Sequence, residues 1–196
     1  QALRVGVDAA APTGVVVSSY LEPMRVERQL SYSFASQTND PWYDTAILAY
    51  TTPSSADFPF TTEGRVAGTV TLSVDLWGVT DWGQSPDHHA LVKLNGAQVG
   101  DGVFFDGNDL VTITASVAEG DLLPGVNTLT VELPGDTGVD FDLVDVDGFT
   151  VEYPRHLVAQ GGRLDFTAAG ASFEVQGLPS SDIVVYRQND DGLERL

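Results

Sequence analysis

The residue types that most resemble a catalytic group occur together at Ser85, Asp87, His88 and His89. A serine, a histidine and an aspartate could supply the nucleophile, the base and the orienting acid of a hydrolase. However, His89–Leu94 is predicted to be a strand, and successive residues of a strand point to opposite faces of the sheet. The two histidines therefore cannot readily act together, and no G-x-S-x-G nucleophile motif occurs in the chain. We expect this pair to be structural and the chain to be non-catalytic.

Aspartates crowd the last long predicted strand. Those that could ligate a metal are Asp140, Asp142, Asp145 and Asp147. Carboxylate oxygens are the ligands that Ca²⁺ prefers, and Asp145-Val146-Asp147-Gly148 followed by Glu152 partly matches a calcium loop. The ligand spacing and the length of that loop are nevertheless missing. Two interpretations remain open, namely a solvated acidic strand and a structural calcium ion that neutralises the clustered carboxylates.

Four aromatic residues could form a platform on which sugar rings stack: Trp42, Tyr43, Trp77 and Trp82. Trp77 and Trp82 lie beside the predicted loop Gly78–Asp87, and loops carry much of the binding function of β-proteins. The same residues could instead fill the core of a sandwich or anchor this loop. Both interpretations remain open at the level of sequence.

The charge of the chain excludes several classes of partner. The 196 residues contain 9 basic and 28 acidic side chains, a net charge of −19, and Lys93 is the only lysine. Such a chain repels nucleic acid and anionic lipid, so neither nucleic-acid binding nor membrane insertion is expected. The absence of cysteine excludes disulfides, thiolate zinc sites and a cysteine nucleophile within this chain. We expect a secreted or cell-surface protein of bacterial type, whose signal peptide is not present in this chain.

The composition favours strands separated by turns, since there are 20 glycines and 10 prolines among many valines and threonines. The clearest alternation of apolar and polar residues runs from Arg65 to Trp77. Leu30, Tyr32 and Phe34 alternate with small residues in the same way. Asn95-Gly96 predicts a type I′ hairpin, with a return strand from Ala97 to about Phe105.

The strands and turns together predict an all-β fold. About nine strands at regular spacing indicate a jelly-roll β-sandwich over residues 1–153. Its last strand, Val139–Tyr153, is predicted to bend at Asp147-Gly148. Residues 154–196 are expected to form a linker and short strands, which either pack on the sandwich or begin the next domain.

Several motifs resemble known families. Two of them are similar to galactose-binding-like jelly rolls, a group that includes many carbohydrate-binding modules: Leu91–Gly96 with Val99-Gly100, and Leu122–Val131. A longer series is similar to the β-rich region that precedes the catalytic domain of gingipain-like (family C25) cysteine peptidases. This series consists of Trp42-Tyr43, Asp87-His88-His89, Leu94-Asn95-Gly96, Pro134–Gly138, Phe149–Arg155, Leu164–Thr167 and Ile183–Tyr186.

The second resemblance implies a role beside a peptidase. Members of that family use a histidine and a cysteine for catalysis, and this chain has no cysteine. No catalytic role is therefore carried over, and the resemblance places the peptidase downstream of Leu196. We expect an accessory or pro-domain of a larger secreted peptidase, which recognises the catalytic domain or a protein substrate. The alternative is a carbohydrate-binding module that holds a glycan on its aromatic platform. No set of residues in the sequence supports the third hypothesis, an autonomous enzyme.

Overall fold

The structure, a computed structural model, describes residues 14–36, 39–118, 120–170, 172–189 and 192–195. All regular secondary structure among these residues is β-strand. No helix long and apolar enough to cross a membrane occurs in this described part. The chain divides into two compact units, of which the larger is Leu21–Arg155 and the smaller combines the two ends of the chain, up to Tyr20 and from His156.

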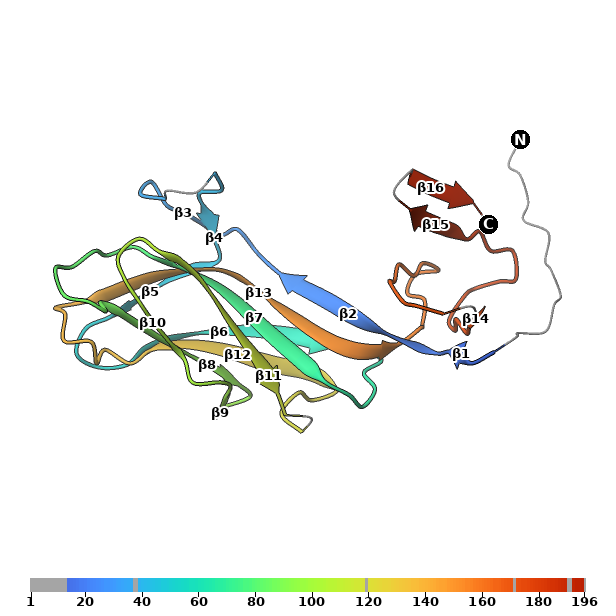
Figure 1. Cartoon of the computed structure of the whole chain (residues 1–196), viewed down its shortest axis with the longest axis horizontal. Helices are drawn as coiled ribbons and strands as arrows, with labels where there is room; N and C mark the ends of the chain where they lie inside the picture. The colour runs from blue at the N-terminus through green and yellow to red at the C-terminus, as the bar shows by residue number, and fades with distance from the viewer. Residues whose placement is uncertain (1–13, 37–38, 119, 171, 190–191, 196) are drawn as a thin grey trace. The chain divides into compact units, whose positions relative to one another are not determined.

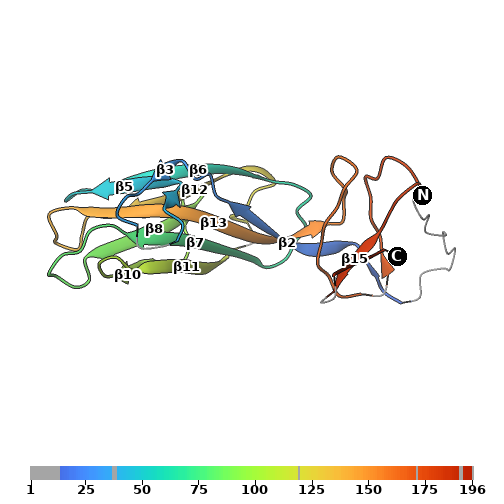
Figure 2. The ribbon, with the colours of Figure 1, turned by 90° about the horizontal axis from the view of Figure 1, so that it is seen from above.

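Two five-stranded sheets form the larger unit (Figure 1). The first has the order β10–β8–β12–β6, with β9 paired to β8. Its strands are β6 (Ser54–Thr62), β8 (His88–Leu94), β9 (Ala97–Gln98), β10 (Val103–Phe105) and β12 (Gly125–Leu133). The second has the order β11–β7–β13–β2, with β5 paired to β13. Its strands are β2 (Ser19–Val26), β5 (Thr45–Ala49), β7 (Val70–Gly78), β11 (Leu110–Val117) and β13 (Asp142–His156). Figure 2 shows β13 running along the sandwich.

The core lies between these two sheets because each strand directs every second side chain inward. In β7 the inward residues are Val70, Leu72, Val74 and Leu76, all of them buried. The first sheet contributes large buried side chains that include Phe58 and Leu129. The predicted all-β sandwich is therefore confirmed.

The turns explain where the predicted strand boundaries were right and where they were wrong. Asn95 and Gly96 both have positive φ, 51° and 86°, which confirms the expected hairpin. The expected return strand is instead split into β9 and β10, separated by Gly100 and Gly102, whose φ values of 72° and 79° interrupt an extended chain. The expected bend in β13 is confirmed by a register shift between Val146 and Gly148.

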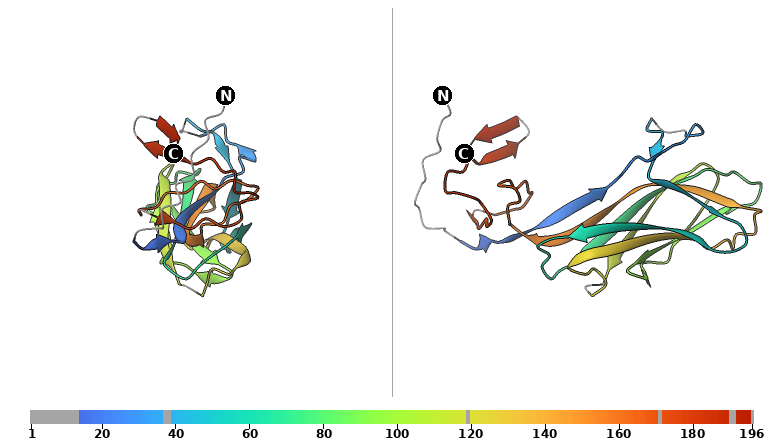
Figure 3. Two further views of the ribbon diagram at one scale, coloured as in Figure 1. Left: turned by 90° about the vertical axis from the view of Figure 1, so that its right-hand side faces the viewer. Right: turned by 180° about the vertical axis from the view of Figure 1, so that it is seen from behind.

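A short hairpin stands clear of the two sheets (Figure 1, Figure 3). It consists of β3 (Ser31–Tyr32) and β4 (Trp42–Tyr43), which pair in antiparallel fashion with Tyr32 opposite Trp42. The strand predicted from the alternation of Leu30, Tyr32 and Phe34 is thus only two residues long, because the chain turns at Phe34.

The smaller unit contains two further strand pairs. β1 (Val16–Val17) runs parallel to β14 (Ser172–Phe173), and β15 (Tyr186–Asn189) pairs with β16 (Gly192–Arg195). Phe166 lies between Tyr20 and Phe173, with ring centroids 5.8 Å and 5.3 Å away, so the two chain ends share an aromatic cluster. By their contacts residues 14–20 group with the tail from His156, although Ser19 and Tyr20 also begin β2.

Candidate functional site

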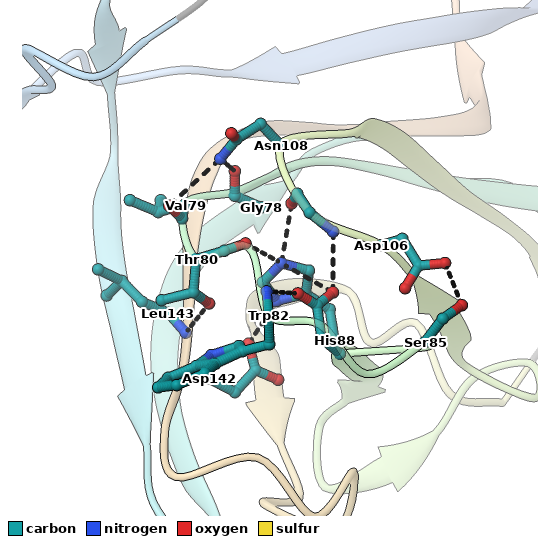
Figure 4. Close-up of polar contacts among 12 residues, drawn as sticks. Gly78, Val79, Thr80, Trp82, Ser85, His88, Asp106, Asn108, Asp142 and Leu143 are labelled. Carbon is teal, nitrogen blue, oxygen red and sulfur yellow. Dashed lines mark hydrogen bonds and ion pairs between the residues drawn. The ribbon is translucent and has the colours of Figure 1, made fainter.

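His88 is completely buried and bonded at both ring nitrogens (Figure 4). Its Nδ1 lies 2.6 Å from Oδ1 of Asp142, which is also buried. Its Nε2 lies 3.0 Å and 2.9 Å from the carbonyl oxygens of Thr80 and Gly107. Because all of these partners are acceptors, both nitrogens carry a proton and the ring is an imidazolium ion.

The charge state of His88 follows from competing effects on its pKa. Burial lowers this pKa. The hydrogen bond to Asp142, the negative charges of Asp142 and Asp87, and the carbonyl of Gly107 act in the opposite direction. The net result is a pKa above the ordinary value of 6.5, which favours the positively charged ring.

Asp87 fixes the loops around this ion pair. Its Oδ2 accepts a hydrogen bond from the backbone N–H of Trp82 at 2.8 Å, and its Oδ1 accepts one from the N–H of Gly107 at 2.8 Å. Asn108 donates from Nδ2 to the carbonyls of Gly78 and Val79, at 3.1 Å and 3.2 Å (Figure 4). Buried polar groups that satisfy one another in this way rigidify a structure.

The other members of the apparent catalytic group lie elsewhere. Ser85 Oγ donates to Asp106 Oδ2 at 2.6 Å rather than to a histidine. His89 stacks on Phe104, with ring centroids 3.8 Å apart, and its Nδ1 lies 2.9 Å from Oδ1 of Asp136. A general base needs a nitrogen that can accept a proton from a nucleophile, and both nitrogens of His88 are occupied by protein acceptors. The cluster is therefore arranged to hold loops together rather than to abstract a proton.

The four aspartates predicted to bind calcium are spread over different surroundings. Asp140 is exposed, Asp142 is paired with His88, and Asp145 is buried. Asp147 Oδ2 accepts a hydrogen bond from Nη2 of Arg25 at 3.0 Å. In the described part of the chain no three His, Asp or Glu side chains gather in a way that could hold a metal ion. As they stand, these residues do not fit a calcium cage.

Two of these aspartates have altered acidity. Burial raises the pKa of Asp145 to about 6, while a hydrogen bond with Ser33 opposes the shift. Burial and the negative charge of Glu27 raise the pKa of Asp147, and the positive charge of Arg25 opposes them. Neither shift is produced by a partner that would poise the carboxylate for catalysis.

Three of the four predicted platform residues are held inside the protein. Trp77 is fully buried, and its Nε1 donates to the carbonyl of Asn108 at 3.1 Å. Tyr43 is buried and stacks on Trp77, with centroids 5.4 Å apart and planes inclined by 15°. Trp82 is partly buried, and its Nε1 donates to the carbonyl of Phe141 at 2.9 Å. Each of these rings therefore anchors a strand or a loop.

Trp42 is the predicted platform residue that faces outward. It is 42% exposed and contacts Tyr32 edge to face, with centroids 5.1 Å apart. Phe34, 96% exposed, also contacts Tyr32 edge to face, with ring centroids 4.8 Å apart. We call Tyr32, Phe34 and Trp42 the outer aromatic face. The alternation at Tyr32 and Phe34 was visible in the sequence, but a two-residue strand that leaves this side exposed could not be distinguished there from a core strand.

A groove adjoins this hairpin on the second sheet. It has a volume of about 380 Å³, and its lining includes Glu27, Asp40, Tyr43, Asp75, Leu110 and Asp147. Arg25 bridges three of the four carboxylates, namely those of Glu27, Asp75 and Asp147. Arg25 is thus shared by three of the four acidic side chains that line the groove. We call this region the acidic groove.

Comparison with known proteins gives matches by structure. No protein-family model and no curated protein matches the sequence. Dimeric latent PorU from Porphyromonas gingivalis is similar over 87% of this chain, at 15% identity and a TM-score of 0.58. The match spans only 15% of the PorU chain.

Carbohydrate-binding modules are also among the structures to which this chain is similar. A family 36 module in complex with calcium and xylotriose matches 65% of this chain and 98% of its own, at 15% identity and a TM-score of 0.42. A family 35 module from Cellvibrio japonicus matches 71% of this chain and 97% of its own, at 12% identity and a TM-score of 0.40. PorU is a gingipain-like peptidase, so structures from both groups that the sequence resembles occur among the matches. At 15% identity the similarity to PorU bears on the fold alone, and that fold is the all-β jelly-roll sandwich described above.

Proposed function

We propose that this chain is a non-catalytic accessory domain or pro-domain of a larger secreted gingipain-like cysteine peptidase and acts by recognising a protein. The observation that carries the proposal is the enclosure of His88, whose two ring nitrogens are bonded to Asp142 and to backbone carbonyls. The residues that most resemble a catalytic group therefore stabilise the fold, and we assign the function to the surface of the domain.

The similarity to PorU supports a modular role. This chain corresponds to 15% of a protein described as latent, so the matched region is one part of a much larger assembly. In such an arrangement the partner is the catalytic domain of the same parent protein or a protein substrate. Secretion follows from the same proposal, and the net charge of −19 suits a soluble extracellular surface.

Two measurements test this proposal. The first is the reading frame of the parent beyond Leu196, where a domain with a histidine and a cysteine in caspase-like arrangement is expected. The second is incubation of the purified chain with fluorescein-labelled casein, which is expected to give no release of fluorescence. A glycoside hydrolase domain in the parent, or release of fluorescence by the purified wild-type chain, would contradict the proposal in different ways.

A carbohydrate-binding module is the second candidate, and the exposure of Trp42 favours it. An indole ring that reaches solvent can stack on the apolar face of a sugar. The test is a glycan array with the wild-type chain and the Trp42→Ala and Trp82→Ala variants. Binding that is lost only in Trp42→Ala would place a sugar on the outer aromatic face, whereas an array without signal would remove this candidate.

A structural calcium ion is an alternative to the main proposal, raised by the aspartates in and just before β13. The residues Asp140, Asp142, Asp145 and Asp147 would have to rearrange to ligate it, because they lie in different surroundings. Melting with and without a chelator decides this question.

A further inference from the structure

The hairpin β3–β4 has two faces with opposite roles. Ser31 and Tyr43 form one cross-strand pair, and Tyr43 is buried against Trp77 on the outward side of the second sheet. Tyr32 and Trp42 form the next pair, so their side chains point the other way, toward solvent. The hairpin thus uses its inner face for attachment and leaves its outer aromatic face uncovered.

The attachment of the hairpin is strong enough to hold that outer face in place. Arg28 donates from Nε and Nη2 to the two oxygens of Asp44, at 2.6 Å each, and Asp44 is buried. This bidentate geometry is the strongest form of an ion pair between these groups. Ser36 Oγ lies 2.8 Å from the hydroxyl of Tyr43, and Ser33 N–H donates to the carbonyl of Pro41 at 2.9 Å. A binding surface that is already held in place loses little conformational entropy on binding, so it binds a partner more tightly.

The three rings of the outer aromatic face are exposed in contact with one another. Tyr32 is 46% exposed and lies between Phe34 and Trp42. Contiguous exposed apolar side chains on a soluble protein mark an interaction site. Aromatic residues are also the type most enriched at the energetic centres of protein interfaces.

The charges around this face select the partner. Asp40 accepts a hydrogen bond from the N–H of Trp42 at 3.1 Å and lines the acidic groove, so the groove begins where the aromatic face ends. Gln29 Nε2 donates to Glu27 and Asp40 at 2.9 Å and 3.2 Å and holds these two carboxylates side by side. The net charge of the chain, −19, has the same sign as that of the groove. A basic partner is therefore attracted and an acidic one is repelled.

The geometry of the rings separates a peptide from a sugar. The three rings do not form one flat platform for a sugar, because Tyr32 meets Trp42 at 80° and Phe34 at 69°. Rings arranged edge to face form an uneven surface, and side chains of a peptide can fit between them. An arginine guanidinium can lie over a ring face, while the next basic side chain reaches a groove carboxylate.

We propose that the outer aromatic face and the acidic groove together dock a basic, extended segment of a partner protein. The segment places apolar or arginine side chains against Tyr32, Phe34 and Trp42 and directs further basic side chains toward Glu27 and Asp40. This inference deepens the proposed function and rests on it, since it names the surface and the class of partner that the domain recognises.

Fluorescence anisotropy tests the proposal with the purified chain and three probes. The first is a fluorescein-labelled peptide of alternating arginine and valine, the second is the same peptide with glutamate in place of arginine, and the third is a labelled xylo-oligosaccharide. The arginine peptide is expected to bind, and its affinity is expected to fall roughly tenfold or more between about 50 mM and about 300 mM NaCl because the charges are screened. The glutamate peptide is expected not to bind.

Substitutions locate the binding surface. Phe34→Ser and Trp42→Ala are each expected to weaken the arginine peptide at least about fivefold, because interface aromatics dominate binding energy. Tyr50→Ser is the matched control, since Tyr50 is an exposed aromatic residue outside the outer aromatic face and the groove. Circular dichroism melting of each variant checks that the fold is retained.

The outcomes distinguish this inference from the proposed function. Absence of peptide binding, equal binding of the glutamate peptide, or an unchanged affinity in Phe34→Ser and Trp42→Ala would overturn the docking surface and leave a non-catalytic accessory domain in place. Binding of the xylo-oligosaccharide alone would overturn it in favour of a sugar module. Cleavage of the peptide by the chain, detected by mass spectrometry, would instead overturn the proposed function.

Discussion

Nδ1 of His88 lies 2.6 Å from Oδ1 of Asp142, and the two side chains belong to different sheets of the sandwich. His88 begins β8 in the first sheet, and Asp142 begins β13 in the second. In a chain without cysteine, this buried ion pair links the two layers at one end of the sandwich. It also converts the most catalytic-looking residues of the sequence into part of the framework.

Replacing His88 with glutamine is predicted to destabilise the protein by about 3–5 kcal/mol, because Asp142 would be left as a buried charge without its cationic partner. The measurement is urea unfolding at pH 7, with His156→Gln as the control, since His156 is exposed. A loss below about 1 kcal/mol for His88→Gln would show that the pair is dispensable.

Gly78 is predicted to tolerate no side chain. A Cβ at this position would lie 2.0 Å from the carbonyl oxygen of Gly107 and 2.6 Å from Nε2 of His88. Gly78→Ala should therefore cost about 2–4 kcal/mol, since the backbone of a loop would have to move. Gly83→Ala is the matched control, because a Cβ at Gly83 meets no atom within 4 Å. Equal melting temperatures for the two variants would contradict this packing.

Features of this structure that depend on neighbouring residues were predictable from the sequence, and features that depend on distant residues were not. The sandwich and the Asn95-Gly96 hairpin were predictable, because alternation and turn chemistry are local signals. The beginning of β7 was predicted too early: Gly68 adopts a φ of 151° and fits against Pro154, a contact between residues far apart in the chain. The bond between His88 and Asp142 spans 54 positions and carries no local signature.

The same reasoning applies to the aromatic residues. Trp42 and Trp77 are the same type of residue, yet Trp42 is exposed and Trp77 is completely buried. Their difference depends on the pairing register of β4 and on the stacking of Tyr43 against Trp77, which are tertiary features. A sequence can therefore indicate that aromatics gather, but the side of the hairpin that faces solvent comes from the structure.

Asp145 is predicted to make the stability of the protein depend on pH. The pKa of Asp145 is about 6 in the folded protein, against an ordinary value of 3.8. Between these two pH values the folded protein holds a proton on Asp145 that the unfolded chain has lost. The stability that this raised pKa contributes is fully present below about pH 3.8 and is lost as the pH rises through about 6.

Asp145→Asn removes this titration and should stabilise the protein by about 1–3 kcal/mol at pH 8, with a smaller gain at pH 5. Urea unfolding at both values measures the difference, and Asp140→Asn serves as the exposed control. A gain that is the same at pH 5 and pH 8 would show that the carboxyl group of Asp145 does not titrate between them.

Chelation is predicted to leave the melting temperature unchanged within about 1 °C, because the aspartates of β13 lie in separate surroundings. Calcium at a hundredfold excess over its dissociation constant would stabilise the chain by about 2.7 kcal/mol. In a protein of this size such a gain corresponds to a shift of about 5–10 °C. A fall of that order on addition of EDTA would establish the calcium site that the sequence pattern raised.

The protonation state of His88 is the most direct test, because the proposed recognition function rests on a structural role for this residue. Long-range ¹H–¹⁵N NMR spectra of the histidine-labelled protein report each ring nitrogen across the pH range. We expect Nδ1 and Nε2 of His88 both to remain protonated at neutral pH and the ring to titrate above 6.5, the ordinary pKa of histidine. A neutral ring with a free nitrogen at pH 7 would contradict it, since such a ring could serve as a general base.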